Sequence, residues 1–184
     1  VLNDLGWDKS ELVEKKSIEI GNIFKLGTRF SEPLNLMYSD EDGSKKPVIM
    51  ASYGIGPGRL LATVVETSHD DKGIIWPTAI APFKVHLVAL DEAYDKGEEI
   101  YQHLVRDGID VVYDDRQDKM PGEKFADADL IGCPVRLVIS KKIIAQGGDE
   151  IQVEVKLRSE KESTLMALSA IPAYVNNLPN SLTL

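Results

Sequence analysis

The sequence contains a single cysteine, Cys133, among its 184 residues. One cysteine cannot form an internal disulfide, which fits a reducing cytosol. Cys133 precedes an apolar segment in the run Ile-Gly-Cys-Pro, so we expect a small buried side chain rather than a reactive thiol. One cysteine and three scattered histidines also offer no cluster of zinc ligands, so we expect no metal site.

Long apolar runs are missing as well. The longest, such as residues 74–76 and 135–139, are far shorter than the roughly 20 residues that a membrane span needs. The chain begins Val-Leu-Asn-Asp, without the basic and then apolar segment of a secretory signal. It also lacks an initiator methionine, which indicates a piece cut from a longer protein.

Basic residues are fewer than acidic ones: the sequence has 21 lysines and arginines and 30 acidic residues, which gives a net charge of −9. This deficit argues against non-specific nucleic-acid binding through bulk charge. It leaves RNA recognition open, because a small patch can read unstacked bases while the remaining surface is acidic. The hydrophobic fraction of 43% is that of an ordinary globular protein, with room for one large domain or two small ones.

The first part of the chain has the pattern of two antiparallel strands followed by a helix. Residues 1–17 are expected to form a helical or irregular lead-in. Apolar residues alternate with polar or small ones in a predicted strand at 18–26, and an acidic, Gly-containing turn at 39–46 leads to a second strand at 47–53. Apolar residues at helical spacing predict a helix over 59–67.

A different rhythm begins near residues 77–83, after a turn at 70–73 and a stiff connector that contains Trp76 and Pro77. The order strand, helix, strand, helix, strand predicts an α/β fold with a parallel or mixed sheet flanked by helices. We expect strands over 84–90, 109–113, 135–140 and 151–158, and helices over 93–107, 124–131 and 162–176.

Glycines and an arginine mark the passage from strand to helix at residues 52–59, Ser-Tyr-Gly-Ile-Gly-Pro-Gly-Arg. Glycines let a backbone approach a ligand closely. Both the helix start and the Arg59 guanidinium favour a phosphate. The alternative is a structural turn with a surface arginine, and the spacing matches neither a P-loop nor a full dinucleotide fingerprint.

An aromatic ring lies close in sequence to acidic and basic residues in the stretch from Tyr113 to Arg136. A ring that stacks, a carboxylate that accepts from a base edge and a guanidinium together suit recognition of unpaired bases. The alternative is that Phe125 packs inward and the charges only solvate a helix. The three histidines, His69, His86 and His103, are expected to fill core or surface positions.

The pattern Gly54-x-Gly56-x-x-Arg59 resembles motif 3 of the class II aminoacyl-tRNA synthetases. Residues 21–31, 53–56 and 69–77 resemble the bacterial-type prolyl-tRNA synthetase family in particular. The resemblance implies that Arg59 stacks on and neutralises ATP phosphates. It also implies a prolyl-adenylate pocket that includes Phe24, Gly27, Thr28, Ser52, Gly54 and Gly56.

Two positions depart from that family, which usually has histidine at Asn22 and commonly cysteine at Ser52. Serine is nearly isosteric with cysteine, so proline still fits. The asparagine is a larger change and points to a divergent lineage or to a copy under less catalytic demand.

Residues 113–136 resemble the anticodon-binding domain shared by the prolyl, threonyl, glycyl and histidyl enzymes. In the prolyl family a phenylalanine, an acidic residue and an arginine contact the two guanines of the UGG anticodon. The resemblance places these roles on Phe125, Asp129 and Arg136, with Arg116 and Lys124 as phosphate or neighbouring-base contacts. The resemblance to the prolyl family as a whole extends from about residue 17 to residue 158.

The resemblance implies a class II catalytic remnant over residues 1–78 and an anticodon-binding domain over 83–184. The family ligates proline to tRNA(Pro) through a prolyl-adenylate, with ATP and Mg²⁺, as a cytoplasmic homodimer. Motifs 1 and 2 are not in this chain, so we expect it to bind no cofactor and to make no adenylate alone. The alternatives are another class II synthetase and an accessory or regulatory RNA-binding module without aminoacylation activity.

Overall fold

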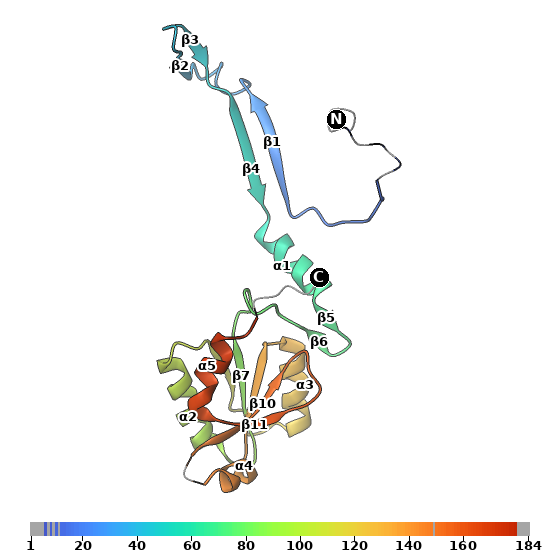
Figure 1. Cartoon of the computed structure of the whole chain (residues 1–184), viewed down its shortest axis with the longest axis vertical. Coiled ribbons are helices and arrows are strands. Elements are labelled where there is room, and N and C mark those ends of the chain that lie inside the picture. The colour runs from blue at the N-terminus through green and yellow to red at the C-terminus, as the bar shows by residue number, and fades with distance from the viewer. Residues whose placement is uncertain (1–5, 7, 9, 11, 149, 180–184) are drawn as a thin grey trace. The chain divides into compact units, whose positions relative to one another are not determined.

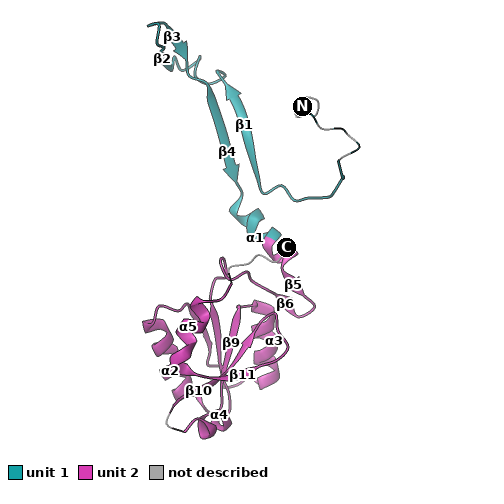
Figure 2. Ribbon diagram, in the orientation of Figure 1, with its two compact units in different colours: residues 1–63 teal, residues 64–184 magenta. Residues whose placement is uncertain are grey.

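The structure is a computed structural model that describes residues 6, 8, 10, 12–148 and 150–179. It divides into two compact units, Val1–Thr63 and Val64–Leu184, which Figure 2 colours separately. This division falls within α1 (Pro57–Thr67), earlier in the chain than the boundary expected near residues 77–83. We describe each unit by itself.

Unit 1 is built on one antiparallel ladder between β1 (Gly21–Gly27) and β4 (Met50–Ile55). A short hairpin of β2 (Met37–Ser39) and β3 (Lys45–Pro47) joins these strands and contains the turn expected at 39–46. α1 begins directly after β4. The predicted succession of two antiparallel strands and a helix is therefore confirmed, with the hairpin as an addition.

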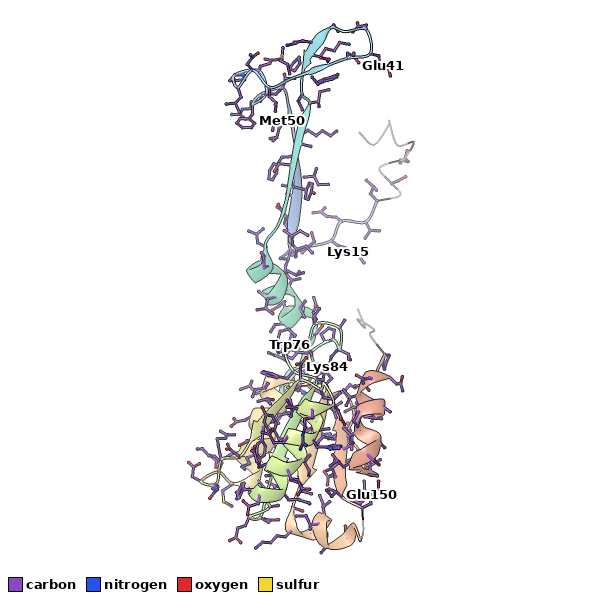
Figure 3. All side chains as sticks on the ribbon, turned by 90° about the vertical axis from the view of Figure 1, so that its left-hand side faces the viewer. Lys15, Glu41, Met50, Trp76, Lys84 and Glu150 are labelled. Carbon is purple, nitrogen blue, oxygen red and sulfur yellow. The ribbon has the colours of Figure 1, made fainter. Side chains whose placement is uncertain are left out.

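The ladder of unit 1 leaves its apolar side chains in the open. Ile23, Tyr53 and Ile55 are 74%, 83% and 67% exposed, and Figure 3 shows the side chains of β1 and β4 projecting freely. Among the residues that the structure describes, every buried apolar side chain lies in unit 2. Unit 1 has strands without a core to cover them.

Unit 2 is an α/β domain around a mixed sheet of five strands in the order β11-β10-β9-β7-β8. β7 (Val85–Ala89) runs parallel to both β8 (Val111–Asp114) and β9 (Val135–Ile139). β10 (Gln152–Leu157) and β11 (Thr164–Ala167) continue the sheet with antiparallel pairing. The predicted mixed sheet with flanking helices is confirmed.

Helices cover both faces of this sheet. Figure 1 shows α2 (Tyr94–Arg106) and α5 (Ile171–Asn176) on one side and α3 (Pro121–Ile131) on the other. The core lies under α2 and α5, where Leu87 and Leu137 of the sheet meet Ile100, Leu104 and Ile171. α4 (Lys141–Gln146) follows β9.

The opposite face of the sheet carries polar residues. His86 of β7 lies between Val112 of β8 and Arg136 of β9 in the parallel register. Residues paired across strands point to the same side, so all three face the layer of α3. This alternation explains a histidine and an arginine inside otherwise apolar strands.

The helix predicted over 162–176 is wrong in its first part and correct at its end. Residues 164–167 form β11, which pairs with β10 from Val155↔Thr164 to Gln152↔Ala167. A 3-10 helix (Leu168–Ala170) and the short α5 follow. The apolar spacing of this region satisfies either period, and the open edge of β10 decides for a strand.

Further elements differ from the sequence prediction. α4 was missed; its N-cap Ser140 accepts a hydrogen bond from the Ile143 amide at 3.3 Å. The turn expected at 70–73 is a small hairpin of β5 (His69–Asp70) and β6 (Gly73–Ile74). No helix among the described residues is both long and apolar enough to cross a membrane.

Candidate nucleic-acid interface

Three of the predicted RNA-contacting residues meet between α3 and β9. Phe125 and Asp129 are four residues apart and so share one side of α3. The guanidinium carbon of Arg136 lies 4.6 Å from the centroid of the Phe125 ring. Arg136 Nη1 donates a hydrogen bond of 3.0 Å to Asp129 Oδ1. We call these three residues the Phe125 cluster.

The Phe125 cluster is partly open to solvent. The side chains of Arg136 and Asp129 are 14% and 18% exposed, and Phe125 is half-buried. Arg136 Nε is buried and has no hydrogen-bond partner among the described residues. A buried donor without a protein partner can be satisfied by water or by a ligand. The cluster offers a flat cation, a ring and a carboxylate, the components of base recognition.

Lys124 does not belong to this surface, although it precedes Phe125 in the chain. Its side chain is fully buried, and Nζ donates to the Ala89 and Asp114 carbonyl oxygens at 2.8 and 3.4 Å. The ammonium also lies 3.7 Å from the Asp114 carboxylate and 5.1 Å from the Tyr94 ring centroid. Burial lowers the pKa of Lys124, and Asp114 opposes that shift. The expected phosphate contact is therefore corrected: Lys124 fastens α3 to the ends of β7 and β8.

Arg116 lies on the other flank of α3. Its Nε and Nη2 donate to the two carboxylate oxygens of Asp114 at 2.9 and 2.7 Å, and Nη2 donates to Asp127 at 2.8 Å. At 3.6 residues per turn, Asp127 points about 200° away from Phe125. The two carboxylates raise the pKa of Arg116 and balance its charge. The structure does not bring Arg116 into the Phe125 cluster.

A hollow of about 350 Å³ lies beside Arg116, between β8 and α3. His86 lines it, is 3% exposed, and its Nδ1 has no hydrogen-bond partner among the described residues. Burial lowers the pKa of this imidazole, so His86 is neutral near pH 7. The position agrees with the expectation that His86 fills the interior.

The residues predicted to contact a nucleotide lie together in unit 1. Phe24 pairs with Ser52 across the β1–β4 ladder, and Asn22 pairs with Gly54, so these side chains share one face. Gly27 ends β1 with a φ of +59°, and Thr28 follows it.

The turn into α1 holds the remaining two predicted residues. Gly56 follows β4 and donates its amide to the Ile20 carbonyl at 3.0 Å. Arg59 lies in the first turn of α1, where Nη1 donates to the Glu19 carbonyl at 2.7 Å. An ATP contact by Arg59 stays a prediction.

Two residues that the sequence did not single out lie next to the Phe125 cluster. Arg158 Nε donates to the backbone carbonyl of Asp129 at 3.0 Å. The other two guanidinium nitrogens donate to the Asp70 carboxylate at 2.9 and 2.6 Å. Asp70 and Arg158 are 88 residues apart in the chain, so no local pattern predicts their pairing.

Comparison with known proteins shows that the chain is similar in sequence to part of several proline–tRNA ligases. The chain is 45% identical over 175 residues to a proline–tRNA ligase of Thermodesulfovibrio yellowstonii, which covers 89% of the chain and 30% of the relative. It is 42% identical over 165 residues to that of Bacillus subtilis, which covers 88% of the chain and 28% of the relative. For the ligase of Aquifex aeolicus the identity is 48% over 147 residues, covering 78% of the chain and 25% of the relative.

The chain thus spans less than a third of the length of these relatives. The family described as anticodon binding domain matches residues 78–178 of the chain. These residues include every strand of the five-stranded sheet and the Phe125 cluster. The chain belongs to the anticodon binding domain family.

Proposed function

We propose that this chain is part of a proline–tRNA ligase and that its unit 2 reads the anticodon of tRNA(Pro). The single observation that carries the proposal is the Phe125 cluster, with its 4.6 Å stack and its 3.0 Å hydrogen bond. A guanine presents two N–H donors that a carboxylate accepts, and its flat ring stacks on an aromatic or guanidinium plane. The UGG anticodon supplies two such bases.

The roles within the cluster follow from the chemistry of each side chain. The Asp129 carboxylate accepts from the guanine ring and amino N–H groups. Arg136 has donors beyond the one that it gives to Asp129, and these suit the carbonyl oxygen of a guanine or a neighbouring phosphate. Phe125 supports the guanidinium from the other side and excludes water from it.

For the whole protein we propose ligation of proline to tRNA(Pro) in two steps through a prolyl-adenylate, with ATP and Mg²⁺, by a cytoplasmic homodimer. Arg59 neutralises the ATP phosphates at the start of α1. The shared face of Phe24, Ser52 and Gly54, together with Gly27, Thr28 and Gly56 next to it, lines the adenylate pocket. The division into a catalytic part over 1–78 and an anticodon-binding part over 83–184 belongs to this proposal.

The chain alone is not expected to catalyse adenylate formation. Adenylate formation depends on positioned charges in a preorganised site. Two of the unit 1 side chains that would form part of that site are exposed, Ser52 and Phe24, the latter at 50%. Proline-dependent exchange of pyrophosphate into ATP by the purified chain would contradict this expectation. An accessory RNA-binding module is not favoured, since the relatives reported above are named as ligases.

A binding titration tests the anticodon assignment. A fluorescent anticodon stem-loop of tRNA(Pro) is titrated with the chain, beside a loop in which adenine replaces both guanines. We expect the UGG loop to bind and the substituted loop to lose most of its affinity. Phe125→Ala and Asp129→Asn should each weaken UGG binding by about 1–3 kcal/mol, the range for a lost stack or base contact.

The matched control is Glu92→Gln, which breaks the exposed Lys141–Glu92 ion pair elsewhere in unit 2. This variant should bind the UGG loop like the unmodified chain. Equal affinity of the unmodified chain for both loops would refute the proposed reading of guanine.

A further inference from the structure

The β5–β6 hairpin packs against the C-terminal end of α3 within unit 2. Trp76 donates its backbone amide to the Gly132 carbonyl at 3.2 Å and its indole N–H to the Ile131 carbonyl at 2.9 Å. A Cβ on Gly73 would lie 2.4 Å from Leu130 Cα, and one on Gly132 would lie 2.0 Å from the Ile74 carbonyl oxygen. Backbone meets backbone here, so the hairpin is held at one distance from the helix.

Arg158 connects the hairpin to the helix. Its guanidinium grips the Asp70 carboxylate with two hydrogen bonds, and its side chain is only 5% exposed. The Asp70 carboxylate also accepts from the Lys72 and Gly73 amides at 2.9 and 3.1 Å. The hydrogen bonds from Arg158 hold the pKa of Asp70 well below its usual range, so this pair is ionised at neutral pH.

The third donor of Arg158 reaches Asp129, the residue assigned to guanine. Asp129 lies in the last turn of α3, whose carbonyl oxygens have no partner within the helix. Arg158 Nε occupies the Asp129 carbonyl at 3.0 Å and places a cation at the negative end of the helix. The side chain of Asp129 accepts the hydrogen bond from Arg136. Asp129 therefore contacts Arg158 through its backbone carbonyl and the Phe125 cluster through its carboxylate, and so links the hairpin to the cluster.

We propose that Asp70 and Arg158 are positioning residues for guanine readout. They fix the last turn of α3 so that the Asp129 carboxylate keeps its place against Arg136 and the base. This inference rests on the proposed function of the Phe125 cluster. It also extends the RNA-reading unit to residues 69–76, which precede the family match at 78–178.

Selectivity separates positioning from mere stability. If the pair only stabilises unit 2, its loss lowers the unfolding midpoint and affects binding of every RNA alike. If it positions Asp129, its loss weakens binding of the UGG loop more than binding of the loop with adenines. Arg158→Lys keeps the charge but cannot form the two-pronged contact, so it should not substitute for arginine.

The experiment measures Asp70→Asn and Arg158→Lys with both stem-loops, beside the unfolding midpoint of each variant. We expect UGG affinity to fall about three- to tenfold, within the lower part of the range for coupled neighbouring groups, while binding of the adenine loop stays the same. Combining Asp70→Asn with Asp129→Asn should add little further loss. Glu92→Gln is again the control and should change the affinity for neither of the two stem-loops.

Three results would overturn the inference: unchanged UGG affinity in folded Asp70→Asn, an equal loss of affinity for both loops, or fully additive losses in the double variant. If Asp70→Asn fails to fold, Asp70→Glu keeps the charge, moves the carboxylate by one methylene, and should lose part of the selectivity. A chain that never distinguishes the two loops would refute the proposed function itself, and the positioning role with it.

Discussion

The two units use similar strands in opposite ways. In unit 2, Leu87 and Leu137 are 0% exposed because helices lie over the sheet. In unit 1, Ile23 and Tyr53 pair across an antiparallel ladder and remain 74% and 83% exposed. A two-stranded ladder is marginal in water unless another layer covers it. The difference shows that strand pairing alone does not make a stable domain, and that unit 1 needs further surface to pack against.

The largest expected effect comes from separating the units. A chain of residues 64–184 should unfold in one cooperative transition, because it contains every buried apolar side chain of the described residues. A chain of residues 1–63 should show no cooperative transition. Circular dichroism during heating measures both. A cooperative transition in the shorter chain would contradict the view that unit 1 lacks a core of its own.

Single core substitutions sharpen the same contrast. Leu87→Ala should lower the free energy of unfolding by about 2–5 kcal/mol, the range for a fully buried leucine. Ile23→Ala removes an exposed side chain and should change the free energy of unfolding by less than about 0.5 kcal/mol. Urea denaturation of the whole chain gives both values. Similar losses at the two positions would mean that Ile23 is covered in solution.

Glycine packing at the end of α3 should have a smaller effect. Gly132 has a φ of +79° and no space for a Cβ, whereas Gly108 has a φ of +77° with no atom within 4 Å of one. Gly108→Ala should cost about 1 kcal/mol for the left-handed backbone alone. Gly132→Ala should cost more, because Ile74 must also move. Equal losses in urea denaturation would show that the hairpin yields easily.

The smallest effect is expected from acid. The lowered pKa of Asp70 means that its ionised form stabilises the folded chain. This contribution is complete above the ordinary aspartate pKa of about 3.9 and is lost as the pH falls toward the lower folded value. The stability difference between the unmodified chain and Asp70→Asn should therefore be constant near neutral pH and shrink below about pH 4. A difference that persists at acidic pH would contradict the ion pair.

The sequence predicted the parts of the molecule that depend on local pattern. The strands around Leu87 and Leu137 follow from apolar runs, and the meeting of Phe125, Asp129 and Arg136 was expected from a family resemblance. Lys124 was misplaced because one residue turns a helix by about 100°, which separates it from its neighbour Phe125. Sequence spacing does not tell which of the two points inward.

Long-range pairing explains the remaining differences. β11 exists because β10 offers an open edge, and a pattern read within residues 162–176 does not contain that information. The Asp70–Arg158 pair likewise joins residues 88 positions apart. Both features appear only when the chain is folded in three dimensions.

Cys133 offers a practical opportunity for labelling. It is 3% exposed, and burial raises the pKa of its thiol to about 11, so little reactive thiolate exists at neutral pH. The sequence has no other cysteine. A cysteine introduced at the exposed Ala126, beside Phe125, would therefore accept a maleimide dye selectively, and the native thiol would not have to be removed first.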